Sequence, residues 1–157
     1  MSSRSGIGID SHRFEPGRRL ILGGVEIPHE AGLAGHSDAD VLTHAVIDAL
    51  LGAAGLGDIG GLFPHTDPAY AGADSMELLR DVVGRVTAAG WSVGHVDATV
   101  MMERPKLAPH RAAIAERLTA ALAGATVNVK ATTGERMGFV GRGEGVAALA
   151  VATIERR

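Results

Sequence analysis

The sequence predicts an α+β fold, a single domain over residues 1–157 in which helices are layered on one face of a mixed β-sheet. Segments with the period of two of a β-strand and segments with helical spacing are mixed along the chain. No linker long enough to divide the chain separates them. A length of 157 residues is also a natural size for one domain with one hydrophobic core.

The first predicted element is a strand in GIGIDSHRF, residues 6–14. Strand alternation puts small and polar residues on one face: Gly8, Asp10 and His12. The opposite face is apolar and holds Ile7 and Ile9. Two side chains with metal-binding groups therefore project in the same direction.

A hairpin is predicted in RRLILGGVEIP, residues 18–28, with Gly23 and Gly24 as its two-residue turn. Residues 29–37, HEAGLAGHS, are expected to form a loop. The next element is a helix over residues 39–54, with Ser37 or Asp38 as its cap. Its apolar residues have helical spacing: Val41, Leu42, Ala45, Val46, Ala49 and Leu50. His44 lies off the centre of this apolar stripe.

Residues 55–74 are rich in Gly, Pro and Asp, which predicts an irregular segment of the kind that often carries function. The sequence from Asp74 to Glu77 resembles a capping box, which opens a helix that ends near Gly90. A strand is expected in WSVGHVDATVMME, residues 91–103. A further helix starts near Pro109 and continues through residues 111–122.

Two strands are predicted at the end of the chain, over residues 126–132 and 145–155, on either side of the glycine-rich TGERMGFVGRGEG. Both faces of the last strand are apolar or small: Val146, Ala148, Ala150 and Ala152 on one, Ala147, Leu149 and Val151 on the other. One layer of helices covers only one face of a sheet. The other face is therefore predicted to pack against a partner subunit, and the alternative is burial within the chain itself.

Composition excludes several classes of protein. Hydrophobic residues make up 46% of the chain and charged residues 21%, as in ordinary globular proteins rather than disordered ones. There is no cysteine, which excludes disulfides and thiolate catalysis and fits a reducing compartment. No secretory signal precedes the first strand and no apolar run approaches the about 20 residues of a membrane span. We therefore expect a cytoplasmic protein with no membrane partner.

Charge and aromatic content disfavour nucleic-acid binding. The net charge is −3 and aromatic residues make up only 3% of the chain, so polyanion attraction and base stacking are both weak. A phosphate group bound here must be held by local donors and a metal.

Asp10, His12 and His44 form a candidate metal site. A carboxylate and two imidazoles suit a zinc-like divalent ion, and three protein ligands leave a fourth position open for a substrate oxygen. The alternatives are solvated polar residues at a strand end and a surface pair of His44 with Asp48. Spacing alone leaves these alternatives open.

Eight motifs in order along the chain carry a family resemblance. They are GIDSHRF (8–14), GHSDAD (35–40), HAVIDALLGA (44–53), GDIG (57–60), FPHTD (63–67), ERPKL (103–107), KATT (130–133) and GFVGRGEG (138–145). Together they resemble the 2-C-methyl-D-erythritol 2,4-cyclodiphosphate synthases over essentially the whole chain.

The resemblance implies a homotrimer with an active site between neighbouring subunits. It also implies conversion of 4-diphosphocytidyl-2-C-methyl-D-erythritol 2-phosphate, a cytidine diphosphate-linked small molecule, into the 2,4-cyclodiphosphate with release of CMP. In the family pattern Asp10, His12 and His44 hold one Zn²⁺ per subunit, and Glu135 holds a second ion, Mg²⁺ or Mn²⁺. His36 and Thr133 match the positions that stabilise the transition state.

The same resemblance implies the substrate contacts. The implied substrate contacts include the zinc ligands Asp10 and His12 and also His36 and Ser37. The methylerythritol phosphate segment comprises Asp58, Ile59, Gly60, Phe63, Pro64, His65, Thr66 and Asp67. The cytidine segment comprises Met102, Glu103, Arg104, Pro105, Lys106, Leu107 and Ala108. The diphosphate segment comprises Thr132, Thr133, Gly134 and Glu135, and Phe139 and Arg142 match positions near the trimer axis.

Some positions depart from the commonest family pattern. His65 replaces an acidic residue, and Gly134 stands where a third threonine is frequent, which bears on the stiffness of the diphosphate loop. Ile9, near the axis, stands where the family often has an aromatic residue. Met102, in the cytidine segment, stands where a small residue is common. Two alternative functions use the same residues: a zinc-dependent phosphatase or nucleotide hydrolase, and a non-catalytic trimeric protein that binds a phosphorylated ligand.

Overall fold

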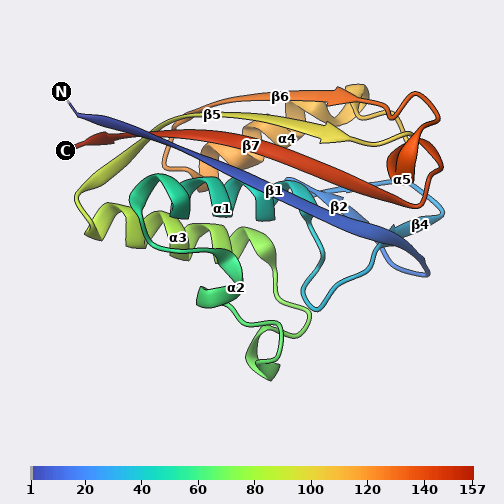
Figure 1. Cartoon of the computed structure of the whole chain (residues 1–157), viewed down its shortest axis with the longest axis horizontal. Helices are drawn as coiled ribbons and strands as arrows, with labels where there is room; N and C mark the ends of the chain where they lie inside the picture. Colours follow the sequence, from blue (N-terminus) through green and yellow to red (C-terminus); the bar gives the residue numbers. More distant parts are fainter. Residues whose placement is uncertain (1) are drawn as a thin grey trace.

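A mixed five-stranded sheet forms one layer of the computed structural model, which describes residues 2–157 (Figure 1). Its strands, in spatial order, are β4 (Ala31–Leu33), β1 (Ser3–Pro16), β7 (Gly145–Arg156), β5 (Trp91–Met101) and β6 (Thr126–Thr132). Only β5 and β6 run parallel, and the other neighbours are antiparallel. The predicted hairpin is confirmed as a separate two-stranded sheet of β2 (Leu20–Leu22) and β3 (Val25–Ile27).

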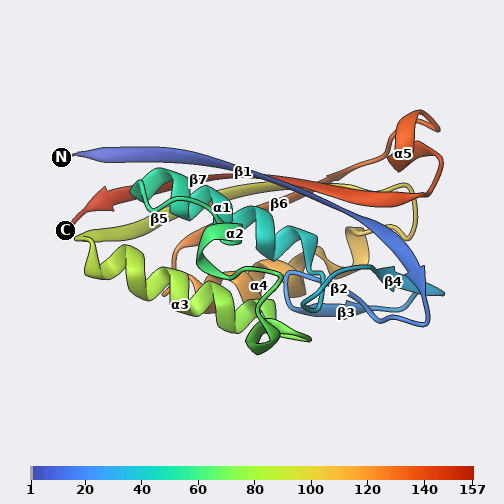
Figure 2. The same ribbon diagram turned by 60° about the horizontal axis from the view of Figure 1, so that its bottom comes forward.

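The three long helices lie on the same side of the sheet, as predicted (Figure 2). They are α1 (Val41–Ala54), α3 (Ser75–Ala88) and α4 (Arg111–Ala121). Residues 2–157 also contain four short helical turns: α2 (Ile59–Leu62), η1 (Pro68–Tyr70), η2 (Ala108–His110) and α5 (Gly138–Gly141). Among the described residues no helix is long and apolar enough to cross a membrane.

Strand β1 packs directly on helix α1 because two glycines lie on its inner face. A Cβ atom on Gly8 would overlap the backbone carbonyl oxygen of Ala45, and one on Gly6 would overlap that of Ala49. Side chains at these positions would push the helix away from the strand. The glycines therefore set the distance between the two elements that carry the candidate metal ligands.

The cap of α1 differs from the prediction. Asp40, not Ser37 or Asp38, accepts a hydrogen bond from the backbone nitrogen of Thr43 at 3.0 Å. The same buried carboxylate also accepts from the backbone nitrogens of Gly23 at 2.9 Å and Gly24 at 2.8 Å. The hairpin turn supplies donors that a local sequence pattern does not reveal, and this selects Asp40 as the cap.

Three segments that were expected to be irregular contain short elements. Residues 29–37 include β4, which extends the sheet beside β1. Residues 55–74 include α2 and η1, and the glycine-rich segment before β7 includes α5. Helix α1 is also buried on nearly every side, so His44 is buried although it lies beside the apolar stripe.

The outer face of the sheet is apolar and exposed in the single chain. Val146, Ala148, Ala150 and Ala152 of β7, which the alternation puts on one face, are buried under the helices. On the other face Ile7 is 59% exposed and Ile9 63% exposed, and their neighbours on β7, Leu149 and Val151, are also exposed. This face extends over two adjacent strands.

The close approach of β1 to α1 makes a stability prediction. We expect Gly8→Ala to lower the free energy of unfolding by about 1–3 kcal/mol, the usual range for overpacking. Gly52→Ala on the same helix is the control, because its Cβ would lie 3.9 Å from the nearest backbone atom of β1, an ordinary contact. Alanine there should be neutral or stabilise by up to about 1 kcal/mol. Urea unfolding at one protein concentration measures both, and equal stabilities would contradict this account of the contact.

Candidate metal centre and active site

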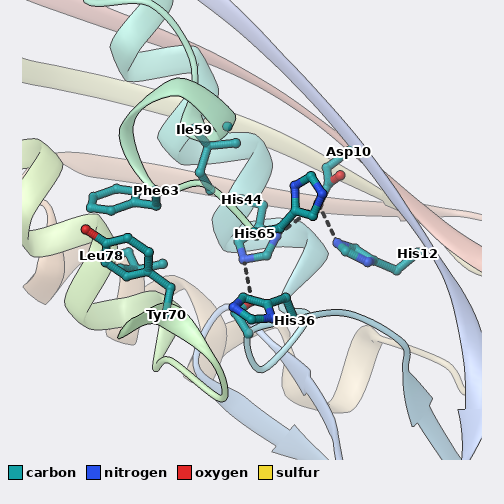
Figure 3. Close-up of a pocket in the computed structure, with 11 residues that line it drawn as sticks. Asp10, His12, His36, His44, Ile59, Phe63, His65, Tyr70 and Leu78 are labelled. Carbon is teal, nitrogen blue, oxygen red and sulfur yellow. Dashed lines mark hydrogen bonds and ion pairs between the residues drawn. The ribbon is translucent and has the colours of Figure 1, made fainter. Parts of the chain in front are cut away.

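Asp10, His12 and His44 come together at the junction of β1 and α1 (Figure 3). One ligand atom from each residue lies within 4.8 Å of the other two. The Oδ2 atom of Asp10 is 2.8 Å from Nε2 of His12 and 3.1 Å from Nδ1 of His44. Residues separated by more than thirty positions thus present three donor atoms to one point.

The backbone fixes which nitrogen of His12 faces this point. Nδ1 of His12 lies 2.7 Å from the carbonyl oxygen of Ala34. A carbonyl oxygen only accepts hydrogen bonds, so Nδ1 carries the ring proton of the neutral imidazole. The Nε2 atom, which faces Asp10, then has a free lone pair.

In His44 a relay of side-chain hydrogen bonds places the ring proton on the other nitrogen, Nε2. Nε2 of His44 is 2.8 Å from the hydroxyl of Ser75, and that hydroxyl donates its own proton in a short hydrogen bond to Asp38. Ser75 therefore accepts from His44, which places the ring proton on Nε2. The Nδ1 atom of His44 is left with its lone pair directed at Asp10.

The centre of the cluster consequently contains two imidazole lone pairs and a carboxylate. Burial raises the pKa of Asp10, but the hydrogen bonds and charges of His12 and His44 outweigh it and lower the pKa to about 2, so the carboxylate is ionised. Burial lowers the pKa of His12, but Asp10 outweighs it and raises this pKa above its usual value. The site favours positive charge at its centre, and a carboxylate with two outward-bonded imidazoles fits a zinc-like divalent ion.

A cavity opens beside the three ligands (Figure 3). The other lining residues are His36, Ser37, Ile59, Gly60, Phe63, His65, Tyr70 and Leu78. Most of them belong to the predicted substrate set. Tyr70, whose ring contacts that of Phe63 with centroids 5.3 Å apart, and Leu78 were not predicted, because neither belongs to a motif.

Several predicted residues shape this cavity through the backbone. Asp58 caps α2 by accepting from the nitrogen of Gly61 at 2.8 Å, and Asp48 accepts from the nitrogen of Ile59 at 2.7 Å. Nε2 of His36 lies 3.0 Å from the carbonyl oxygen of Asp67. Pro64, Thr66 and Asp67 belong to the same irregular segment without lining the cavity.

The predicted cytidine segment lines a different cavity. Its walls are Met102, Glu103, Pro105, Lys106, Leu107 and Ala108, together with Arg111, Ala131, Thr132 and Thr133. This cavity lies beside β6, whereas the metal ligands lie on β1 and α1. Strands β1 and β6 are separated by β7 and β5, which corresponds to three strand spacings or about 14 Å.

The remaining predicted residues lie near the same end of the sheet as α5. Gly134 and Glu135 belong to the loop after β6. Arg104 and Arg142 line a third cavity with Phe14, and Phe139 lines a fourth with Ser11. A single chain therefore does not bring Thr133 and Glu135 to the cavity that contains His36.

The fold and the cluster define an α+β protein with a candidate divalent-metal centre in an open cavity. The chain belongs to the YgbB family, whose profile matches residues 3–155. It is 60% identical over 156 residues to a 2-C-methyl-D-erythritol 2,4-cyclodiphosphate synthase of Alkalilimnicola ehrlichii, covering 98% of this chain and 95% of that protein. The synthase of Symbiobacterium thermophilum is 59% identical over 154 residues, covering 97% of this chain and 98% of the relative.

Solved structures show the same fold. A CDP-bound 2C-methyl-D-erythritol-2,4-cyclodiphosphate synthase superposes with a TM-score of 0.88 at 40% identity, covering 97% of this chain and all 100% of that one. The bifunctional IspDF of Campylobacter jejuni gives a TM-score of 0.95 at 42% identity. That match covers 99% of this chain and 43% of the bifunctional protein.

Sequence reasoning did not identify the outer partners of the ligands, Ala34, Ser75 and Asp38. Ala34 acts through its backbone, which no side-chain motif reveals. Ser75 stands in the capping sequence of α3, and Asp38 stands in GHSDAD. Their polar side chains in two motifs on either side of His44 were the available signal.

The relay to His44 predicts an effect on metal affinity. We expect Ser75→Ala to weaken Zn²⁺ binding about 10- to 100-fold, the usual cost of losing an outer partner of a ligand histidine. The start of α3 is retained, because Asp38 also accepts from the backbone nitrogen of Ser75 at 3.0 Å. Competition with a chromophoric chelator measures the affinity, and Ser92→Ala, a half-buried serine of β5 on a different strand from the ligands, is the control. Unchanged affinity in Ser75→Ala would show that Ser75 does not hold His44, whose Nε2 atom also lies 3.2 Å from the hydroxyl of Ser37.

Proposed function

We propose that this chain converts 4-diphosphocytidyl-2-C-methyl-D-erythritol 2-phosphate into 2-C-methyl-D-erythritol 2,4-cyclodiphosphate and releases CMP, as a cyclising phosphorus-oxygen lyase of the non-mevalonate isoprenoid pathway. The observation that carries this proposal is the cluster of Asp10, His12 and His44 beside an open cavity. It lies in a chain 60% identical to a protein named for this synthesis. A cytoplasmic location is part of the proposal and agrees with the absence of cysteine.

Asp10, His12 and His44 would hold one Zn²⁺ per chain, and Glu135 would hold Mg²⁺ or Mn²⁺ that enters with the substrate. When bound, these ions supply charge that neutralises the phosphate oxygens and polarises the phosphorus under attack. The open side of the cluster, which faces the cavity, supports a direct contact with a phosphate oxygen.

The reaction requires little chemistry from the side chains. An oxygen of the substrate's own 2-phosphate forms a bond to the β-phosphorus, and the bond from this phosphorus to the bridging oxygen breaks as CMP leaves. The protein must fold the substrate back on itself and stabilise changing charge. The proposal assigns charge stabilisation to His36 and Thr133, which match the family positions.

The two cavities take the two ends of the substrate in this proposal. Residues of the metal cavity, including Ile59, Gly60 and Phe63, would enclose the methylerythritol phosphate. The cavity of residues 102–108 would take the cytidine, in agreement with the CDP that is bound in a solved synthase of the same fold. Thr132–Glu135 would hold the diphosphate between them.

A homotrimer with active sites between subunits completes the proposal. In one chain the two cavities share no residue, and β7 and β5 lie between the strands that carry them. In this proposal a neighbouring subunit brings its residues 102–108 and 132–135 to the metal cavity of the first chain, and the two cavities together form one active site. The exposed apolar face of β1 and β7 supplies a surface of the kind that subunits bury.

Turnover is tested by incubating the protein with the diphosphocytidyl substrate, Zn²⁺ and Mg²⁺, and by following phosphorus NMR. We expect a pair of coupled cyclic diphosphate resonances together with CMP. His44→Ala should lose bound metal and turnover, whereas His110→Ala, which lines none of the cavities described above, should retain both. Inorganic phosphate or a linear product would instead indicate a hydrolase, and binding without turnover would indicate a ligand-binding protein.

The subunit contact is tested by placing a charge on the apolar face. We expect Leu149→Asp to dissociate the trimer, because a carboxylate buried in an interface without a partner is costly. Ala88 is exposed at the end of α3, in the helix layer and away from the apolar face, so Ala88→Asp should remain trimeric. Light scattering after size-exclusion chromatography gives the mass of each variant. A monomeric wild-type chain, or a Leu149→Asp trimer, would contradict the assignment of this face.

A further inference from the structure

The loop after β6 has an unusual backbone. Glu135 has a φ of 51° and Arg136 a φ of 62°, so two consecutive residues that are not glycine adopt the left-handed conformation. This conformation is unfavourable for residues with a side chain and persists only where surrounding contacts hold it. Thr133 and Glu135, to which the proposed function assigns charge stabilisation and the second ion, both lie in this loop.

Glu103 supplies the contacts that hold the loop. Its Oε2 atom accepts a hydrogen bond from the backbone nitrogen of Gly134 at 2.8 Å, and its Oε1 atom accepts from that of Arg136 at 3.2 Å. One carboxylate therefore binds the loop on both sides of Glu135. Hydrogen bonds to a charged acceptor are stronger than those between neutral groups.

Helix α5 fixes the loop on another side. A Cβ atom on Gly134 would collide with the backbone of Gly141, and one on Gly141 would overlap the backbone of Arg136. The nitrogen of Met137 also donates to the carbonyl oxygen of Gly134 at 2.8 Å. The absence of a side chain at Gly134 thus permits tight packing. The N–H groups that this packing leaves without a backbone partner donate to Glu103.

Glu103 also belongs to the wall of the proposed cytidine cavity. Backbone N–H groups that follow one another in such a loop form a concave site that attracts anions. The carboxylate of Glu103 occupies this site from within the chain. A carboxylate directed at a diphosphate would repel it, whereas the carboxylate of Glu103 is directed at the two N–H donors of the loop.

We propose that Glu103 is a positioning residue: it forms the diphosphate loop before the substrate arrives and couples that loop to the cytidine cavity, without touching the substrate itself. This inference rests on the proposed function for the roles of Thr133 and Glu135. It changes the role that the family resemblance gives to Glu103 as one of the cytidine contacts.

Hydrogen exchange without any ligand tests the structural step. We expect Glu103→Gln and Glu103→Ala to accelerate exchange of the amides of Gly134 and Arg136 by about tenfold or more, the value of one charge-assisted hydrogen bond. Glu116→Gln, an exposed glutamate on α4, is the matched control and should leave both amides unchanged. Unchanged protection in the Glu103 variants would overturn the inference, and this result does not depend on whether the proposed reaction occurs.

Nucleotide affinity tests the functional step. Calorimetry with cytidine and with CDP in the presence of Mg²⁺ separates the nucleoside from the diphosphate contribution. In Glu103→Gln we expect the gain in affinity from cytidine to CDP to shrink about tenfold, while cytidine affinity changes less than about twofold. In turnover, kcat should fall more than KM rises. The opposite pattern, a loss of cytidine affinity with an unchanged diphosphate gain, would identify Glu103 as a direct contact and overturn the inference.

Discussion

The packing of β1 on α1 is the constraint on which the site depends. Gly6 and Gly8 allow the strand to lie against the helix backbone, and the next two inward positions of the same strand are Asp10 and His12. His44 stands near the start of that helix. A strand and a helix held this close place three donor atoms around one point, and a side chain on either glycine would separate them. The hydrophobic core and the metal centre therefore share one contact.

The hydrogen bonds around the ligands decide the chemistry of their centre. Each imidazole donates its proton outward, to Ala34 or to Ser75, so the inward side has only lone pairs and the charge of Asp10. These outer partners lie on the segment before α1 and at the start of α3, and Asp38 connects the two. Binding of a cation would consequently stabilise the arrangement of these segments, which also border the cavity.

The sequence predicted the elements with regular patterns and the positions of their chemical groups. Alternation in β1 and β7 correctly separated the two faces of each strand, and helical spacing correctly indicated the helix α1. Contacts between distant segments escaped prediction: the choice of Asp40 as the cap depends on the hairpin turn, and the relay through Ser75 depends on α3. The role of Glu103 escaped for the same reason, because its partners are backbone nitrogens about thirty residues away. Periodicity reports local geometry, whereas these contacts exist only in the folded chain.

X-ray absorption at the zinc edge of protein loaded with one equivalent of Zn²⁺ tests the arrangement of lone pairs most directly. Two imidazole nitrogens and one carboxylate oxygen at about 2.0–2.1 Å, with a fourth light atom in the open position, is the expected coordination shell. The multiple-scattering pattern of two histidines should be present, and it should lose one histidine in His44→Ala. A shell of water oxygens alone, or a spectrum that His44→Ala leaves unchanged, would contradict a metal centre built from Asp10, His12 and His44.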